Sequence, residues 1–182
     1  MHRPFLNELE SQTQRAGIAG RIETVCASTF APPFDPASFD VIWAEGAAFI
    51  MGFREALAAW KPLLAEKGYM AITHLCWLRD KPPEEIRRFW AENFPAMASV
   101  EDNLRIIGET GYEEIGHFTL PTAAWWNDYY DPLEKNLVRL RQKYANDAEA
   151  LKWIAASQSE IDMYRKYSNY YGYVFFVMRK CS

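Results

Sequence analysis

The chain has 182 residues, of which 49% are hydrophobic and 24% are charged, as in an ordinary globular protein. Its net charge of −4 argues against the basic face that nucleic-acid binding needs and, more weakly, against an anionic membrane surface. No apolar run approaches the ~18 residues of a membrane span, and no signal-peptide pattern follows the first residues. Cys26, Cys76 and Cys181 fit no metal motif, so we expect reduced thiols and a cytoplasmic location.

The first expected element is an amphipathic helix that ends at Gly17. Phe5 and Leu9 recur in it at helical spacing, with polar residues between them. Residues 21–26 then alternate between polar and apolar side chains, which predicts a strand. The prolines of residues 31–36 predict a loop before the next element.

The stretch of residues 39–49 organises the predicted fold. Residues 41–43, Val-Ile-Trp, form a short apolar run between loop signals, which predicts a buried strand. Glu45 and Gly46 follow at the carboxyl end of that strand, where an open α/β sheet receives a ligand and where glycine lets it approach the backbone. The alternative is a plain strand-to-loop junction with a solvated Glu45.

Helical and strand patterns alternate through the rest of the chain. We expect helices over residues 53–64, ended by Lys67–Gly68, over residues 80–90, and over residues 100–107, ended by Gly111. We expect strands over residues 69–75, 114–120 and 173–178. This alternation predicts right-handed crossovers, a mostly parallel sheet and an α/β fold, and we expect residues 1–182 to form one domain.

An insertion separates the last two expected strands. Residues 121–171 carry helical patterns and are too many for a turn, so we expect them to cover something. Among their aromatic residues are Trp125, Trp126, Tyr129, Tyr130, Tyr164, Tyr167, Tyr170 and Tyr171. Such residues can wall a pocket for a flat or apolar substrate, or stack on a cation. Helix-to-sheet packing is the alternative, and we expect at least half of them to be core.

Four pieces of the sequence resemble, in order, a class I S-adenosylmethionine-dependent methyltransferase. They are Pro33–Phe34, residues 39–47 (FDVIWAEGA), the helix running to Leu63–Leu64 with Lys67–Gly68–Tyr69, and the strand that ends at Thr73–His74. Further segments are similar to bacterial small-molecule methyltransferases: Gly52–Phe53, Ala124–Trp125 and residues 170–175. The resemblance runs over nearly the whole chain. It implies a Rossmann-like, mostly parallel sheet with an antiparallel last strand and a helical insertion.

The resemblance also implies parts that these 182 residues do not contain. The family's sheet begins with a strand and a glycine-rich GxGxG loop that holds the methionine part of the cofactor. A second strand ends in an acidic residue that binds the ribose. Neither is found in this sequence, so the chain resembles an N-terminally truncated methyltransferase. We therefore expect an exposed apolar sheet edge, with a risk of aggregation and a possible homodimer.

The resemblance assigns candidate site residues. Ser28 and Thr29 fall in the loop that faces the adenine, while Glu45 and Gly46 fall at the methionine end of S-adenosylmethionine. His74 ends a strand on the ligand side, where its titration range suits a general base. The candidate substrate residues are Trp125, Trp126, Tyr129, Tyr130, Tyr167 and Tyr171. The structural alternatives are a turn for Ser28, a solvated carboxylate for Glu45 and a packing role for His74.

These residues together predict methyl transfer from S-adenosylmethionine to a small molecule, without a nucleic-acid or membrane partner. The insertion over residues 121–171 would be a lid that keeps water from the transferring methyl group. The alternative is a non-catalytic, truncated module for binding or dimerisation. Another α/β nucleotide enzyme is disfavoured because no glycine-rich phosphate-binding motif is present.

Overall fold

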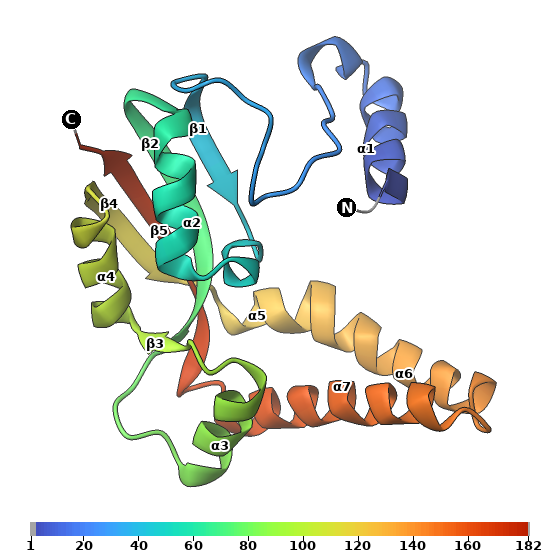
Figure 1. The fold of residues 1–182 in the computed structure, drawn as a ribbon. Coiled ribbons are helices and arrows are strands. Elements are labelled where there is room, and N and C mark those ends of the chain that lie inside the picture. The colour runs from blue at the N-terminus through green and yellow to red at the C-terminus, as the bar shows by residue number, and fades with distance from the viewer. Residues whose placement is uncertain (1–2, 182) are drawn as a thin grey trace.

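The computed structural model describes residues 3–181, which form one five-stranded sheet with helices around it (Figure 1). The strands are β1 (Phe39–Ala44), β2 (Leu64–Trp77), β3 (Ala98–Ser99), β4 (Tyr112–Thr119) and β5 (Tyr171–Lys180). Their order in the sheet is β1-β2-β5-β4, and the short β3 pairs with the end of β2.

The strand directions confirm the predicted fold class. β1 and β3 run parallel to β2, whereas β5 runs antiparallel to both β2 and β4. Four of the described strands therefore point the same way, and the last strand points the other way. This is the Rossmann-like α/β arrangement with an antiparallel last strand.

Helices make up most of the rest of the described chain. They are α1 (Arg3–Arg15), α2 (Phe53–Trp60), α3 (Glu84–Asn93), α4 (Val100–Glu109), α5 (Thr122–Trp125), a π-helical turn (Trp126–Tyr130), α6 (Asp131–Lys143) and α7 (Ala148–Tyr167). Short 3-10 turns occupy residues 19–21, 48–50 and 61–63. Among the described helices, none is both long and apolar enough to cross a membrane.

One core lies between the sheet and the helices α2 and α4. Alternate residues of β2 and β5 share a face because side chains alternate along a strand. Met70, Ile72 and Cys76 of β2 lie on this face with Phe176 of β5, and all four are fully buried against Leu57 and its neighbours on the helices. This core fixes the position of β1 and β2, whose carboxyl ends border the site described below.

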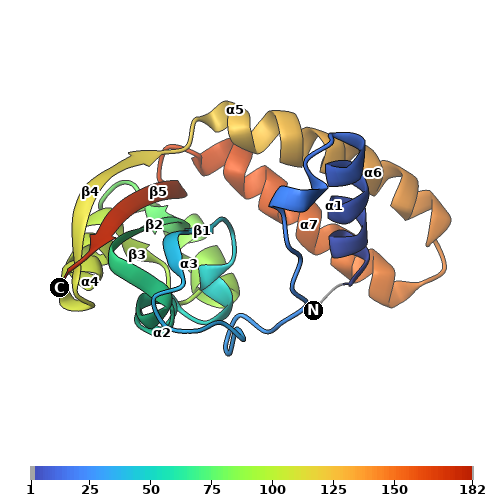
Figure 2. The ribbon, with the colours of Figure 1, turned by 90° about the horizontal axis from the view of Figure 1, so that it is seen from above.

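A second core joins α3 to the helical insertion. It is formed by Leu75, Ile86, Trp90, Trp125, Tyr130, Leu137, Ile154, Ile161, Tyr164, Tyr167 and Tyr171. The insertion lies between β4 and β5 and is helical, as expected, and Figures 1 and 2 show α6 and α7 extending away from the sheet. Asp147 caps α7 by accepting hydrogen bonds from the backbone N–H groups of Glu149 and Ala150.

Two expected elements are wrong. Residues 21–26 form no strand: Arg21 ends a 3-10 turn, and the residues after it have no regular structure. A strand needs a hydrogen-bonded neighbour, and this segment has none among the described residues. Helix α2 ends at Trp60 rather than at Lys67–Gly68, since Pro62 cannot donate the next helical hydrogen bond.

The residues expected to stop that helix lie inside β2 instead. Lys67 has a positive φ of 60°. A Cβ on Gly68 would lie 3.2 Å from the carbonyl oxygen of Asp40, so glycine allows the close approach of β1. The register between β1 and β2 shifts at this point. Lys67 and Gly68 are therefore special backbone positions within a strand, and not the end of a helix as predicted.

Strand β1 is buried on one face only, which corrects the expectation of a fully buried strand. Ala44 is buried and Ile42 packs against the α2 side, while Val41 and Trp43 are 53% and 65% exposed. β1 is an edge of the described sheet, so it lacks a neighbour on one side. An apolar sheet edge is thus exposed, as the sequence predicted.

Candidate functional site

A cavity of about 500 Å³ lies at the carboxyl ends of β1 and β2, between the sheet and the helices α3, α5 and α7. It is lined by Gly46, Phe49, Thr73, His74, Leu75, Trp90, Asn93, Phe94, Leu120, Ala124, Trp125, Tyr129, Glu160 and Tyr173. Strands lie about 4.8 Å apart, so the ends of β1 and β5 stand about 10 Å apart across this cavity. We call the region of Gly46, Phe49 and Thr73 the β1 side, and that of Trp125, Tyr129, Glu160 and Tyr173 the helical side.

Gly46 anchors the β1 side. Its φ of 56° is in the left-handed region that favours glycine, and its N–H donates a hydrogen bond to Thr73 Oγ1 at 2.9 Å. A Cβ placed on Gly46 would have no heavy atom within 4 Å, so the backbone here is open to a ligand. Glu45 is exposed and outside the cavity lining, and its Oε1 accepts a hydrogen bond from the Trp43 indole at 2.6 Å.

His74 lines the cavity from within β2 rather than from the end of its strand. Its ring stacks on Phe53 at 4.5 Å between centroids and meets Phe94 edge-on at 5.6 Å. The side chain is 2% exposed, and this burial lowers its pKa to about 4. The imidazole is therefore neutral near pH 7 and is a weak proton acceptor.

Glu160 brings a carboxylate to the helical side and was missed by the sequence analysis. Its Oε1 accepts a hydrogen bond from the Tyr130 hydroxyl at 3.0 Å, and burial raises the pKa of the carboxyl group. Glu160 lies four residues before Tyr164 on α7, so the two share the inward face of that helix. Glu160 could have been identified from the sequence as a site residue, because it is a charged residue within the apolar stripe of a predicted helix.

The structure separates the six candidate aromatic residues into those that line the cavity and those that do not. Trp125 and Tyr129 line the cavity. Tyr130 and Tyr171 are fully buried in the second core, outside the cavity lining. Tyr167 belongs to the same core and Trp126 packs against it. Arg165 lies over the ring of Trp126, and the Tyr167 hydroxyl donates a hydrogen bond to Glu85. Tyr173, two residues after Tyr171 in β5, is a lining residue that the sequence analysis did not select.

Ser28 and Thr29 lie outside the cavity lining, in an exposed turn. The Ser28 hydroxyl accepts a hydrogen bond from the Phe30 N–H at 3.3 Å, and its carbonyl accepts one from the N–H of Ala31. The carbonyl of Thr29 accepts a hydrogen bond from the Trp60 indole at 3.0 Å. These contacts give Ser28 and Thr29 a structural role, as parts of a turn that is held against α2.

Comparison with known proteins identifies relatives in structure alone. No family model matches the chain, and no curated protein matches it in sequence. The structure of YjhP from E. coli aligns with 99% of this chain over 74% of the YjhP chain, at 18% sequence identity and a TM-score of 0.80. A SAM-dependent methyltransferase from Geobacter sulfurreducens, solved with S-adenosyl-L-homocysteine, matches 94% of this chain with 69% of its own, at 19% identity and a TM-score of 0.74.

The chain has the fold of the S-adenosylmethionine-dependent methyltransferases. At such low identity, the likeness is one of fold. The [4+2]-cyclase SpnF also matches 94% of this chain at 18% identity, with a TM-score of 0.71. The same methyltransferase fold therefore carries a different reaction in that protein, and the residues of the site must decide the function. The chain spans 60% of the length of SpnF.

Proposed function

We propose that this chain belongs to an S-adenosylmethionine-dependent methyltransferase that acts on a small molecule. The observation that carries the proposal is the cavity at the carboxyl ends of β1 and β2, where α/β sheets of this kind receive ligands. The helical insertion forms one wall of this cavity, and Gly46 forms part of the opposite one. A volume of about 500 Å³ is in the range of small-molecule sites.

The residues of the β1 side fit one end of the cofactor. The open backbone at Gly46, with its left-handed conformation, permits close approach of a ligand. Glu45 directly precedes it and remains a predicted contact of the methionine portion, although its carboxylate is held by the Trp43 indole. Ser28 and Thr29 remain predicted contacts of the adenine. When bound, S-adenosylmethionine would supply an electrophilic methyl group.

The residues of the chain would then position the acceptor and exclude water. Methyl transfer is an in-line displacement. The main requirement is therefore to hold the acceptor atom, the methyl group and the sulfur in line inside a site that excludes water. Trp125 and Tyr129 of the insertion wall the cavity, which suits the role of a lid. His74 is neutral and buried, and a ring nitrogen would orient the methyl acceptor. Because its pKa is low, His74 would act as a general base only if the methyl acceptor were strongly acidic.

Titration calorimetry of the 182-residue chain with S-adenosylmethionine tests this function. We expect saturable binding, at least about tenfold weaker than that of the Geobacter sulfurreducens protein, because one missing hydrogen bond worth ~1.4 kcal/mol gives that factor. The sequence has no GxGxG loop to supply such bonds. The alternative function, a non-catalytic binding or dimerisation module, predicts no binding of the cofactor at millimolar concentration, and that result would contradict our proposal.

A further inference from the structure

The helical side of the cavity contains an acid, Glu160, without a basic partner in the described part of the chain. Among residues 3–181, none of the ion pairs involves Glu160. Its one hydrogen-bond partner among these residues is the hydroxyl of Tyr130. Removal of water from an unpaired carboxylate is costly, so this side chain favours a ligand that brings a positive charge.

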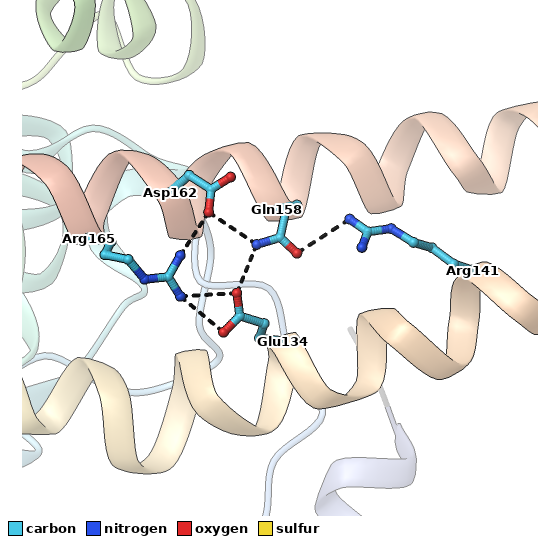
Figure 3. Close-up of polar contacts among 5 residues, drawn as sticks. All are labelled: Glu134, Arg141, Gln158, Asp162 and Arg165. Atoms are coloured by element: carbon cyan, nitrogen blue, oxygen red, sulfur yellow. Dashed lines mark hydrogen bonds and ion pairs between the residues drawn. The ribbon is translucent and has the colours of Figure 1, made fainter.

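The cations nearest in sequence on α7 are bound to other acids. Arg165 donates to Asp162 at 2.9 Å and to both carboxylate oxygens of Glu134 on α6 at 3.0 Å (Figure 3). Gln158 donates to the same two acids, which completes a network between the two helices. Lys166 pairs with Glu85 of α3. Glu134, Asp162 and Glu85 thus have basic partners from the chain itself, whereas Glu160 has none among the described residues.

The aromatic rings show the same contrast. Within residues 3–181, lysine or arginine side chains lie over the rings of Tyr112, Tyr144, Tyr170, Trp126 and Tyr167. Among the described residues, no such cation lies over the rings that line the cavity. Trp125 stacks on Tyr173 with 5.1 Å between centroids. Burial first, and then the nearby charge of Glu160, raise the pKa of Tyr129; burial, Tyr129 and Glu160 raise the pKa of Tyr173. Ring faces beside an unpaired carboxylate form the usual environment for an alkylammonium group.

We propose that the methyl acceptor is a small aliphatic amine, whose nitrogen binds between the Glu160 carboxylate and the ring of Tyr129. This inference rests on the proposed function and names its substrate class. The amine would react as its free base, after its ammonium form has released a proton to water. Its nitrogen would form the new N–C bond with its lone pair, while the C–S bond breaks and its electron pair stays on the sulfur as a neutral thioether. The positive charge thus moves from sulfur to nitrogen.

The helical side stabilises this charge where it arrives. A tertiary amine would leave as a quaternary ammonium ion, held by the carboxylate and the ring faces. A primary or secondary amine would pass its extra proton to the Glu160 carboxylate, whose buried position strengthens it as a proton acceptor. Both products fit a cavity that is aromatic on its walls and acidic at one point.

Two probes of equal shape test the inference by calorimetry of the full chain. Choline carries a quaternary nitrogen, and 3,3-dimethylbutan-1-ol carries a carbon atom in its place. We expect choline to bind at least about tenfold more tightly, since cation–π contacts and a desolvated carboxylate act on the charge alone. Glu160→Gln and Tyr129→Leu should each reduce this preference at least about fivefold. Tyr129→Phe, which keeps the ring, should preserve it.

Glu149→Gln is the matched control, because it removes the same charge from an exposed position of the same helix. It should leave the preference for choline unchanged. Equal binding of the two probes, or a preference that survives Glu160→Gln, would overturn the inference. Displacement of choline by S-adenosylmethionine would also overturn it, since the cation site would then belong to the cofactor.

The two proposals fail separately in these titrations. Binding of S-adenosylmethionine without any preference for choline contradicts the amine subsite and leaves the proposed function standing. A preference for choline without binding of S-adenosylmethionine contradicts the proposed function, and with it the role of the bound amine as a methyl acceptor. Melting temperatures of all variants, measured alongside, confirm that each one is folded.

Discussion

Burial shifts the two titratable side chains of the cavity in opposite directions. His74 has its pKa lowered to about 4, and Glu160 has its pKa raised from the usual value. Both shifts favour the neutral form, because the water that would solvate a charge has been removed. His74 packs between Phe53 and Phe94 as a neutral ring, so it completes the wall. Glu160 is the group whose charge an entering cation would stabilise.

The pH dependence of stability should reveal the buried imidazole. The folded pKa of His74, about 4, lies below the unfolded value of 6.5, so the unfolded state binds more protons between these two values. The contribution of His74 is fully present above pH 6.5 and is lost as the pH falls towards 4. The shift corresponds to about 3 kcal/mol. His74→Phe keeps the stacking on Phe53 and removes the titration.

Urea unfolding of both proteins at pH 7, 5.5 and 4 measures this effect. Between pH 7 and pH 4 the wild-type protein should lose about 3 kcal/mol more than His74→Phe. Glu160 titrates in both proteins, so its contribution cancels in the comparison. Parallel losses of the free energy of unfolding in the two proteins would show that His74 titrates normally and is not buried as described.

Site residues on β1 and β2 were accessible to sequence reasoning, and those on the insertion were only partly so. Gly46 and His74 follow or lie in strands whose apolar runs are local in the sequence. Trp125 and Tyr129 were selected by aromatic density alone. Whether Glu160 reaches the cavity depends on the rotation of α7, and whether Tyr173 does depends on which side of β5 faces the helices. Tertiary packing sets both.

The insertion is a structural element as well as the wall of a cavity. Its core residues pack on Trp90 and Ile86 of α3 and on Tyr171 of β5. Deletion of residues 123–168 would therefore expose apolar surface on the rest of the fold, in addition to opening the cavity. Point substitutions separate the two effects better than a deletion.

The hairpin of α6 and α7 should depend on its apolar contacts more than on its ion pairs. Leu137 is fully buried in the second core, so Leu137→Ala should cost about 2–5 kcal/mol of the free energy of unfolding. Arg165 is about half exposed, and its pairs with Glu134 and Asp162 are screened by water (Figure 3). Arg165→Gln should cost at most about 1 kcal/mol.

Urea unfolding of the two variants gives both values directly. A cost for Arg165→Gln equal to that of Leu137→Ala would contradict the ranking and would assign the stability of the hairpin to its polar network. Helix boundaries in this region were predictable in outline from periodicity. The π-helical turn at Trp126–Tyr130 was not; the rings of Trp125 and Tyr130 stack across it, a contact that periodicity does not reveal.

The molecule as a whole has an apolar edge and an apolar face next to each other. On β1, Val41 and Trp43 are exposed, and Trp43 meets Phe175 edge-on at 5.1 Å. Phe175 stacks in turn on Phe118 of β4, which is 54% exposed. An edge strand with free backbone groups beside such a row favours pairing with another chain.

A protein of these 182 residues should therefore self-associate through β1. We expect sedimentation to show a mass that rises with concentration, and Val41→Lys to shift the protein towards the monomer because a charged edge strand resists pairing. Val138→Lys is the control: Val138 is 54% exposed on α6, away from the sheet edge, and its substitution should leave the association unchanged. A monomeric wild-type protein at all concentrations would contradict this prediction.

The overall α/β order was predictable because each helix and buried strand carries its own pattern. The errors arose where structure depends on distant partners. Residues 21–26 have the alternation of a strand without a neighbour, and Lys67–Gly68 have the signature of a helix stop but serve the close contact of β2 with Asp40. The exposed face of Val41 and Trp43 likewise depends on what packs beside β1.

The central claim is that one cavity holds the cofactor at its β1 side and an amine at its helical side. The amide spectrum of the ¹⁵N-labelled chain, titrated first with S-adenosylhomocysteine and then with choline, tests it directly. We predict that the first ligand shifts the amides of Gly46 and Phe49, and that choline then shifts those of Tyr129, Glu160 and Tyr173 without reversing the first set. Choline that displaces S-adenosylhomocysteine, or ligands that leave these amides unmoved, would contradict the claim.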